Sequence, residues 1–197
     1  GLTQAKPGAA PRWDASIWVD DIAKSYQVAL AAGAKGATPP TAIGTMGQAA
    51  SIVDPTGAAI SLWQGDGRED REQTPVGDWA WNELWTPDAS KALVFYEKAF
   101  GYTHEAMSMG DQGTYLMLVA SGRPRGGIFQ APDSSTPPMW MPYVQVADCD
   151  ATADKATALG AKVFMPPTQV AGVGRFAAMF DPQGAAIAFI KSDPQPV

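Results

Sequence analysis

The segment Asp54–Ile60 reads DPTGAAI, and Asp181–Ile187 reads DPQGAAI, 127 residues later. These segments end a longer repeat in which Trp13–Ile60 aligns with Trp140–Ile187 without a gap, with 19 of 48 positions identical. Each copy of such a repeat is one supersecondary unit that buries its apolar face against another unit. The sequence therefore predicts a fold assembled from copies of one small unit.

A shorter match lies at the N-terminus. The first five residues read GLTQA, and Gly127–Ala131 reads GIFQA, now at an offset of 126. Residues 1–11 are therefore predicted to be the last strand of a missing unit followed by a connector. The unit at 12–64 would then be half of an N-terminal domain, and we expect it to pair with a second copy or with a missing N-terminal segment.

The composition argues against several function classes. The 197 residues carry 14 basic and 20 acidic side chains, a formal charge of −6, and no basic stripe that could bind nucleic acid. No apolar run approaches the roughly 20 residues that span a membrane. The single cysteine, Cys149, rules out an intrachain disulfide and is expected to be a small packed side chain. A cytoplasmic protein without nucleic-acid or membrane partners is expected.

Polar stretches divide the chain into three units. Residues 65–78 lack any apolar period and are predicted to be a linker. The units are 12–64, 79–131 and 139–191, and the last two would form a complete C-terminal domain over 79–197. Alternating apolar residues predict opening strands at Ser16–Val19, Trp79–Trp85 and Tyr143–Val146.

Each opening strand is followed by a helix and three more strands. In the middle unit Thr86-Pro87-Asp88 predicts the start of the helix and Gly101 its end, with Leu93, Tyr96 and Phe100 at helical spacing between them. The Asp-Pro-x-Gly segments predict tight turns before the last strand of each outer unit. The expected order is strand, helix, strand, strand, strand, abbreviated β-α-β-β-β.

This order, the Asp-Pro-x-Gly turn and the middle-unit segment TPDASKALVFYEKAFG at 86–101 resemble the vicinal oxygen chelate superfamily, which includes glyoxalase I, bleomycin-resistance proteins and extradiol dioxygenases. More narrowly, the chain is similar to two-domain, four-module glyoxalase or hydroxylase-like proteins, with the first module missing. The resemblance implies an α+β fold of repeated β-α-β-β-β modules, in which paired modules form a cup-shaped mixed β-sheet barrel.

The resemblance also implies where metal ligands would stand. In metal-dependent members they lie on the first and last strands of each module, positions that here hold Trp81, Phe129, Met141 and Ala188. None of these offers the imidazole or carboxylate donors that divalent cations prefer. The complete module pair is therefore expected to bind no metal and no cofactor. In the first unit the equivalent positions are Asp14 and Ser61, and one carboxylate does not make a site.

Without a metal, the cup remains a place for a small molecule. Period 2 places Trp81, Glu83 and Trp85 on one face of their strand, which the resemblance directs into the cup. Two indoles beside a carboxylate could hold a planar or cationic ligand, or could simply fill the cavity. Glu83 is a weak candidate for catalysis. The predicted binding residues are Trp81, Glu83, Trp85, Tyr115, Met117, Phe129, Met141 and Tyr143.

Two further polar residues, His104 and Arg175, are candidates for functional groups. His104 is the only histidine and is expected to be solvated rather than catalytic. Arg175 follows a glycine-containing loop and could meet an anionic ligand, but a surface position is favoured.

The leading hypothesis is a glyoxalase or bleomycin-resistance-like protein that binds a small, largely apolar or aromatic molecule in a metal-free cup. The alternative is a metal-dependent lyase, or a hydroxylase or dioxygenase-like enzyme, with its site in the N-terminal barrel. A third possibility is an interaction role for the unit at 12–64. The sequence leaves open whether the protein is an enzyme.

Overall fold

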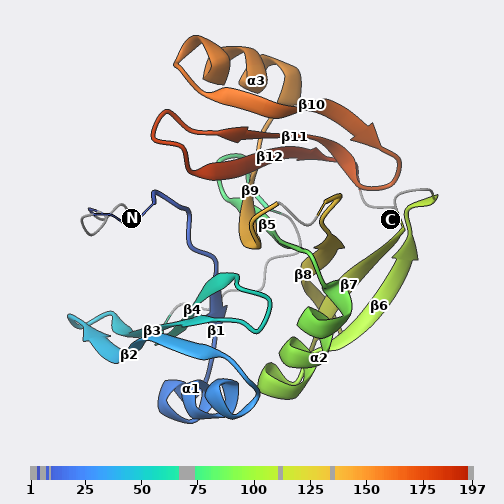
Figure 1. The fold of residues 1–197 in the computed structure, drawn as a ribbon. Coiled ribbons are helices and arrows are strands. Elements are labelled where there is room, and N and C mark those ends of the chain that lie inside the picture. The colour runs from blue at the N-terminus through green and yellow to red at the C-terminus, as the bar shows by residue number, and fades with distance from the viewer. Residues whose placement is uncertain are drawn as a thin grey trace. The chain divides into compact units, whose positions relative to one another are not determined.

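The computed structural model describes residues 10–66, 74–110, 113–133 and 136–194, together with Gln4 and Gly8. Three successive segments have the same order of elements (Figure 1). The first segment contains β1 (Ser16–Trp18), α1 (Ile22–Ala31), β2 (Lys35–Ile43), β3 (Gly47–Val53) and β4 (Ala59–Gly65). The middle segment contains β5 (Trp79–Thr86), α2 (Ala89–Phe100), β6 (Thr103–Ser108), β7 (Thr114–Ala120) and β8 (Arg123–Gln130). The third contains β9 (Met139–Gln145), α3 (Cys149–Ala158), β10 (Lys162–Val170), β11 (Gly174–Phe180) and β12 (Ala186–Ser192).

The three segments have the same strand order. In each, the first strand pairs in parallel with the last, as β1 does with β4, β5 with β8, and β9 with β12. The other strands follow in antiparallel pairing, which gives the orders β1-β4-β3-β2, β5-β8-β7-β6 and β9-β12-β11-β10. The predicted α+β class and repeated order are confirmed. The described strands form mixed sheets that are not closed into a barrel, because strands such as β2 remain sheet edges.

The chain packs as two compact units. The larger unit consists of Asp14–Asp70 and Asn82–Trp140, so it combines the first segment with most of the middle one. The smaller unit consists of Gly1–Trp13, Arg71–Trp81 and Met141–Val197, so it contains most of the third segment. The division of the chain at 65–78 into a half domain and a complete domain at 79–197 stays a prediction.

The three helices begin in the same way. Asp21, Asp88 and Asp148 each precede a helix and accept a hydrogen bond from the backbone N–H three residues later, at 2.9 Å in every case. These carboxylates satisfy N–H groups that a helix leaves unpaired at its start. The middle helix ends where the sequence predicts, at Gly101, which has a left-handed backbone with φ of 71°.

One strand is longer than its sequence pattern indicates. The third segment was predicted to open at Tyr143, whereas β9 begins at Met139. Trp140, Met141 and Pro142 are buried, so the strand has no alternation of apolar and polar residues over this part. A strand covered on both faces loses the period on which the prediction depended.

A buried group of three polar side chains joins the first and middle segments within the larger unit. The Tyr96 hydroxyl of α2 donates to the Asp54 Oδ2 atom at 2.9 Å, and the indole N–H of Trp140 donates to the Tyr96 hydroxyl at 2.8 Å. Tyr96 is fully buried, and Asp54 and Trp140 are 3% and 7% exposed. Each of these polar groups therefore replaces lost water contacts with a protein partner.

The other oxygen of Asp54 holds the Asp-Pro-x-Gly turn. It accepts hydrogen bonds from the Thr56 hydroxyl and from the backbone N–H groups of Thr56, Gly57 and Ala58, at 2.7 to 3.1 Å. Both oxygens of this buried carboxylate therefore have hydrogen-bond donors within the protein. Asp54 therefore fixes its own turn with one oxygen and anchors α2 with the other.

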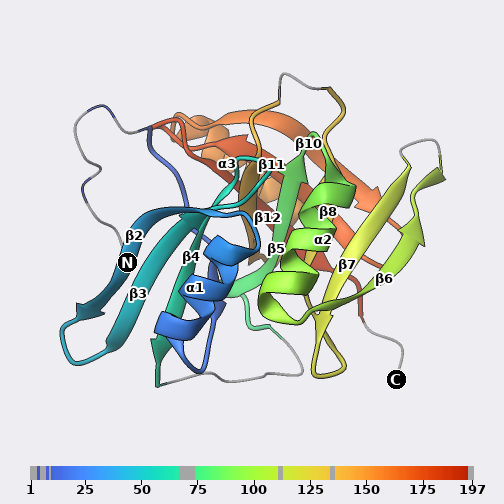
Figure 2. The same cartoon turned by 60° about the horizontal axis from the view of Figure 1, so that its bottom comes forward.

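An apolar core surrounds this polar group. Helices α1 and α2 lie side by side (Figure 2), and the buried side chains beneath them belong to one cluster that includes Ile22, Ala29, Ile52, Phe95 and Leu118. The Trp140 ring packs edge-on against Tyr96, with ring centroids 5.3 Å apart. The first and middle segments therefore share one core.

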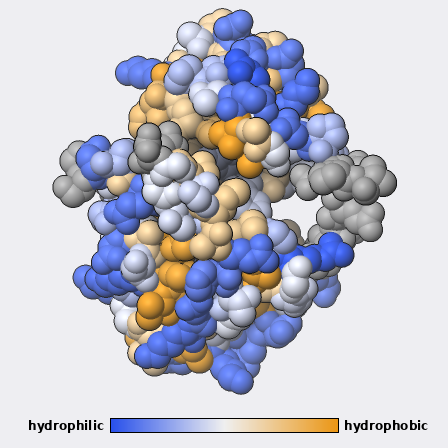
Figure 3. All heavy atoms as spheres, turned by 90° about the vertical axis from the view of Figure 1, so that its right-hand side faces the viewer, coloured by the Kyte–Doolittle hydropathy of each residue, from blue (hydrophilic) through white to orange (hydrophobic). Residues whose placement is uncertain are grey.

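Apolar and hydrophilic side chains alternate over the surface drawn in Figure 3. Large exposed apolar residues in the described part of the chain include Met46, Val94 and Leu159. None of the helices in that part is both long and apolar enough to span a membrane.

The buried hydroxyl of Tyr96 predicts a loss of stability at high pH. Burial, and then the negative charge of Asp54, hold the pKa of Tyr96 well above its usual value. In the unfolded chain Tyr96 loses its proton near pH 10, so the free energy of unfolding should fall by roughly 1 kcal/mol between pH 9 and 11 through this group. Urea denaturation at both pH values should show that loss in the wild type.

The variant Tyr96→Phe isolates this contribution, because all other tyrosines and lysines titrate equally in both proteins. We expect the variant to have a lower free energy of unfolding than the wild type at pH 9, and the difference between the two proteins to be smaller at pH 11. An equal difference at the two pH values would contradict a buried neutral hydroxyl at this position.

Candidate functional site

The register of the middle-segment sheet places most of the predicted binding residues on one face. In the larger unit, Glu83 pairs with Gly127 and Trp85 with Phe129 between β5 and β8. Met117 of β7 pairs with the same Gly127. Directly paired residues point to the same side of a sheet. Together with Tyr115, two residues before Met117, these side chains form what we call the aromatic face: Glu83, Trp85, Tyr115, Met117 and Phe129.

The aromatic face contains a carboxylate held by an indole. The Trp85 Nε1–H group donates to the Glu83 Oε1 atom at 2.5 Å. The rings of Trp85 and Phe129 pack at 5.5 Å with an interplanar angle of 51°. Trp85 is 8% exposed, whereas Glu83 and Phe129 are half-buried. Trp85 therefore backs the face, while Glu83 and Phe129 present atoms to solvent.

The side chain of Tyr115, on β7, lies over Gly127 of the neighbouring strand β8. Its phenol ring lies against Gly127 so closely that a β-carbon at position 127 would overlap both the ring and the hydroxyl. Tyr115 is 9% exposed and Met117 is half-buried. Gly127 pairs with Glu83 between β8 and β5. The absence of a side chain at Gly127 thus leaves room for the Tyr115 ring beside Glu83. The sequence showed no sign of this glycine's role.

The other three predicted binding residues, Trp81, Met141 and Tyr143, belong to the smaller unit. Met141 and Tyr143 are buried there and Trp81 is half-buried. Tyr143 pairs with Ala188 across β9 and β12, and its ring lies 6.1 Å from that of Phe176. Their part in binding stays a prediction.

The positions equivalent to family metal ligands do not fit a metal ion. Trp81 and Phe129 are half-buried aromatic residues, and Met141 and Ala188 are fully buried apolar ones. In the first segment Asp14 is exposed and Ser61 pairs with Ser16. The described residues contain no group of three or more histidine, cysteine, aspartate or glutamate side chains placed to share an ion. No step of a reaction is therefore assigned to a metal here.

The remaining candidates for chemistry have structural partners. His104 is exposed on β6, where its Nδ1 atom lies 2.7 Å from Glu97. Arg175 binds Asp150 through two hydrogen bonds of 2.6 and 2.7 Å, which lowers the pKa of that carboxyl group. Cys149 is buried at the start of α3, where burial and then the charge of Asp150 raise its pKa to about 11. A thiol in this state is a poor nucleophile.

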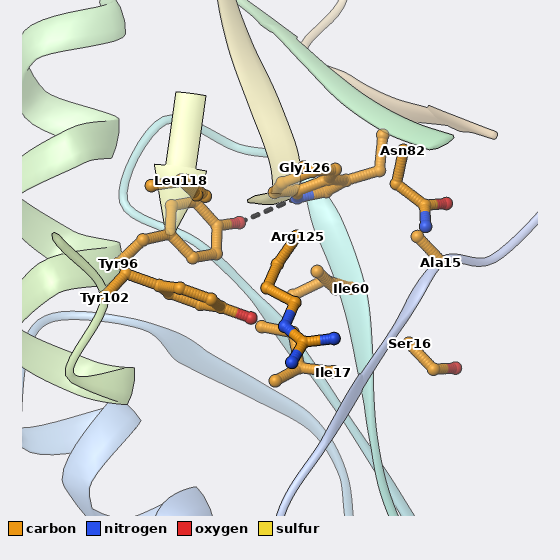
Figure 4. Close-up of a pocket in the computed structure, with 11 residues that line it drawn as sticks. Ala15, Ser16, Ile17, Ile60, Asn82, Tyr96, Tyr102, Leu118, Arg125 and Gly126 are labelled. Atoms are coloured by element: carbon orange, nitrogen blue, oxygen red, sulfur yellow. Dashed lines mark hydrogen bonds between the residues drawn. The ribbon is translucent and has the colours of Figure 1, made fainter. Parts of the chain in front are cut away.

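A small cavity lies on the opposite face of the middle-segment sheet, within the larger unit. Asn82, Tyr102 and Arg125 are among the polar residues that line it (Figure 4), and the Tyr102 hydroxyl points toward the Arg125 side chain. Its volume is about 30 Å³, which suits a single water molecule. The cavity is therefore too small for an organic ligand. Sequence reasoning missed all three residues, because none belongs to a motif.

Substitution of Gly127 tests whether the Tyr115 ring lies over this position of the aromatic face. Gly127→Ala should destabilise the protein by about 1–3 kcal/mol, because the new methyl group must displace a well-packed ring. In a Tyr115→Ala background the same change should cost much less, since the ring is gone. Thermal and urea denaturation of the three variants measure the difference.

The Tyr115→Phe background is the matched control, because the phenylalanine ring still occupies the space above Gly127. The cost of Gly127→Ala should stay high there. Equal costs in the alanine and phenylalanine backgrounds would show that the tyrosine ring does not lie over Gly127.

The family model for the glyoxalase/bleomycin resistance protein/dioxygenase superfamily matches residues 80–189, more than half of the chain. Proteins named "Putative glyoxylase CFP32" from Mycobacterium bovis and Mycobacterium tuberculosis are 38% identical to this chain over 192 residues, which are 97% of this chain and 74% of theirs. The "Anthracycline biosynthesis protein DauV" of Streptomyces sp. strain C5 is 30% identical over 194 residues, covering 94% of this chain and 69% of that protein.

Solved structures show the same fold at low identity. A 2,2',3-trihydroxybiphenyl 1,2-dioxygenase from Sphingomonas wittichii strain RW1 matches with a TM-score of 0.63 at 16% identity, over 94% of this chain and 72% of that one. An Mn(II)-bound glyoxalase from Novosphingobium aromaticivorans matches with a TM-score of 0.58 at 18% identity, over 92% of this chain and 65% of that one. The chain belongs to the glyoxalase/bleomycin resistance protein/dioxygenase superfamily, also called the vicinal oxygen chelate superfamily.

Proposed function

We propose that this protein binds a small, largely apolar or aromatic molecule on the aromatic face of the larger unit, without a metal ion. The observation that carries the proposal is the Trp85 indole, which packs against Phe129 and donates to Glu83. Ring edges, a thioether and a carboxylate then meet on one side of the sheet. Such a surface suits a planar ligand that carries a positive charge or a hydrogen-bond donor.

The five side chains have different parts in this proposal. The half-buried Phe129 and Met117 contact the ligand, and Met117 adapts to its outline because a thioether chain is flexible. Glu83 fixes the orientation of the ligand through its charge. Trp85 and Tyr115 form the wall behind, since both are almost fully buried. The name of the Streptomyces relative, which refers to anthracycline biosynthesis, agrees with an aromatic ligand.

The alternative is an enzyme of the same superfamily, either a metal-dependent lyase or a hydroxylase or dioxygenase-like protein with its site in the N-terminal barrel. The mycobacterial relatives carry a glyoxylase name, which favours it. Against it, the first segment offers only Asp14 and Ser61 at the positions equivalent to the family's ligands, and the middle and third segments offer aromatic and aliphatic side chains. Glu83 is the one carboxylate of the aromatic face and could move a proton.

The probe 9-aminoacridine, a planar cation, tests the proposal by isothermal titration. We expect binding in the micromolar range that is unchanged by a chelator. Phe129→Ala should weaken binding by about tenfold, because a stacking ring contributes on the order of 1 kcal/mol. Glu83→Gln should weaken the binding of this cation by a similar factor. The same variant should bind the uncharged compound anthracene-9-methanol as tightly as the wild type does.

Val94→Ala, on the exposed side of α2, is the control and should bind like the wild type. Binding that survives both Phe129→Ala and Glu83→Gln would place the ligand elsewhere. Atomic emission on the purified protein decides between the two functions. A stoichiometric transition metal whose removal abolishes binding would overturn the metal-free proposal and favour the enzyme.

A further inference from the structure

The edge strand β6 adds a second carboxylate beside the aromatic face. Glu105 of β6 pairs with Met117 of β7. Met117 in turn pairs with Gly127 of β8, and Gly127 pairs with Glu83 of β5. Because directly paired residues point to the same side of a sheet, these four positions form one row on one side of the middle-segment sheet. Glu83 begins this row and Glu105 ends it.

The contact of His104 shows independently which side of β6 carries Glu105. His104 precedes Glu105 on the strand, and its Nδ1 atom lies 2.7 Å from Glu97 of α2. Successive residues of a strand point to opposite sides, so Glu105 points away from α2. Glu105 is exposed, and so is Met107, which pairs with Tyr115. The apolar surface beside the row therefore continues to the edge of the sheet.

The two carboxylates stand at a separation that the sheet fixes. Neighbouring strands lie about 4.8 Å apart, so three steps place the backbones of Glu83 and Glu105 about 14 Å apart. The positions between them hold Gly127 and Met117, and neither of these is charged. A ligand that reaches both carboxylates therefore needs a group that binds a carboxylate at each end of a long apolar body.

We propose that this site takes an elongated aromatic dication, with one cationic group at Glu83, the other at Glu105, and the apolar body over Met117. This inference rests on the proposed function and names the class of its ligand. Once one cationic group has bound, the second meets its carboxylate at a high effective concentration. An amidinium or guanidinium group suits each end, because it can donate two parallel hydrogen bonds to a carboxylate.

Stilbamidine, a rigid planar molecule with an amidinium group at each end, tests the proposal by isothermal titration at low ionic strength. Glu105→Gln should weaken its binding about threefold, because an ion pair at an exposed position contributes modestly. The same variant should bind 9-aminoacridine, which has a single charge, as tightly as the wild type does. Glu83→Gln should weaken the binding of both compounds.

Glu97→Gln is the matched control, because it removes a carboxylate on the α2 side of β6 and changes the net charge equally. This variant should bind stilbamidine like the wild type. Equal affinities of Glu105→Gln and Glu97→Gln for stilbamidine would overturn the dication proposal. The proposed function would still stand in that case if Glu83→Gln weakens the binding of 9-aminoacridine. If the wild type binds neither compound, both proposals are wrong.

Discussion

The hydrogen-bonded chain from Trp140 through Tyr96 to Asp54 is the constraint on which the larger unit depends. Its three residues come from the start of β9, from α2 and from the turn after β3, and all are buried. A buried carboxylate and a buried hydroxyl are costly unless each finds a partner, so the three elements must meet in one arrangement. Apolar packing alone would tolerate sliding of α2 over α1, whereas this contact does not.

This constraint also determines which side of the middle-segment sheet packs against the core. Because α2 and the first segment cover one face of β5, β8 and β7, residues such as Leu84, Leu118 and Ile128 are used for the core. The alternate residues point the other way and form the aromatic face. On the covered side the described residues enclose a cavity of about 30 Å³, beside Arg125. One face of the sheet is therefore used for packing, and the proposed binding would use the other.

Local sequence signals predicted the framework well. The Asp-Pro-x-Gly turns, the aspartate caps and the β-α-β-β-β order depend on neighbouring residues, whose chemistry is visible in the sequence. The alternation in β5 predicted that Glu83 and Trp85 share a face, and the register of β5 with β8 puts Phe129 on the same face. The sequence could not show that Trp85 is buried and Phe129 is partly exposed, because exposure depends on what other elements cover.

Contacts between distant positions were not predictable. Tyr96 lies at helical spacing with Leu93 and Phe100, and this pattern indicates a core residue. It does not indicate that the hydroxyl binds Asp54, 42 positions away. Compensating changes between the repeat copies are equally hidden. Tyr26 packs over Gly36 in the first copy, and the counterparts at the offset of 127 are Ala153 and Val163. Only the structure shows that Tyr26 and Gly36 touch.

A double-mutant cycle between Asp54→Ala and Tyr96→Phe, measured by urea denaturation at pH 7, tests most directly whether the buried contact joins the two segments. Asp181→Ala, which removes the equivalent turn aspartate in the third segment, replaces Asp54→Ala in the control cycle. The structure predicts a coupling free energy of about 1–2 kcal/mol between Asp54 and Tyr96 and a value near zero in the control. If the losses in free energy of unfolding from Asp54→Ala and Tyr96→Phe simply add, the contact between the two side chains does not join the segments.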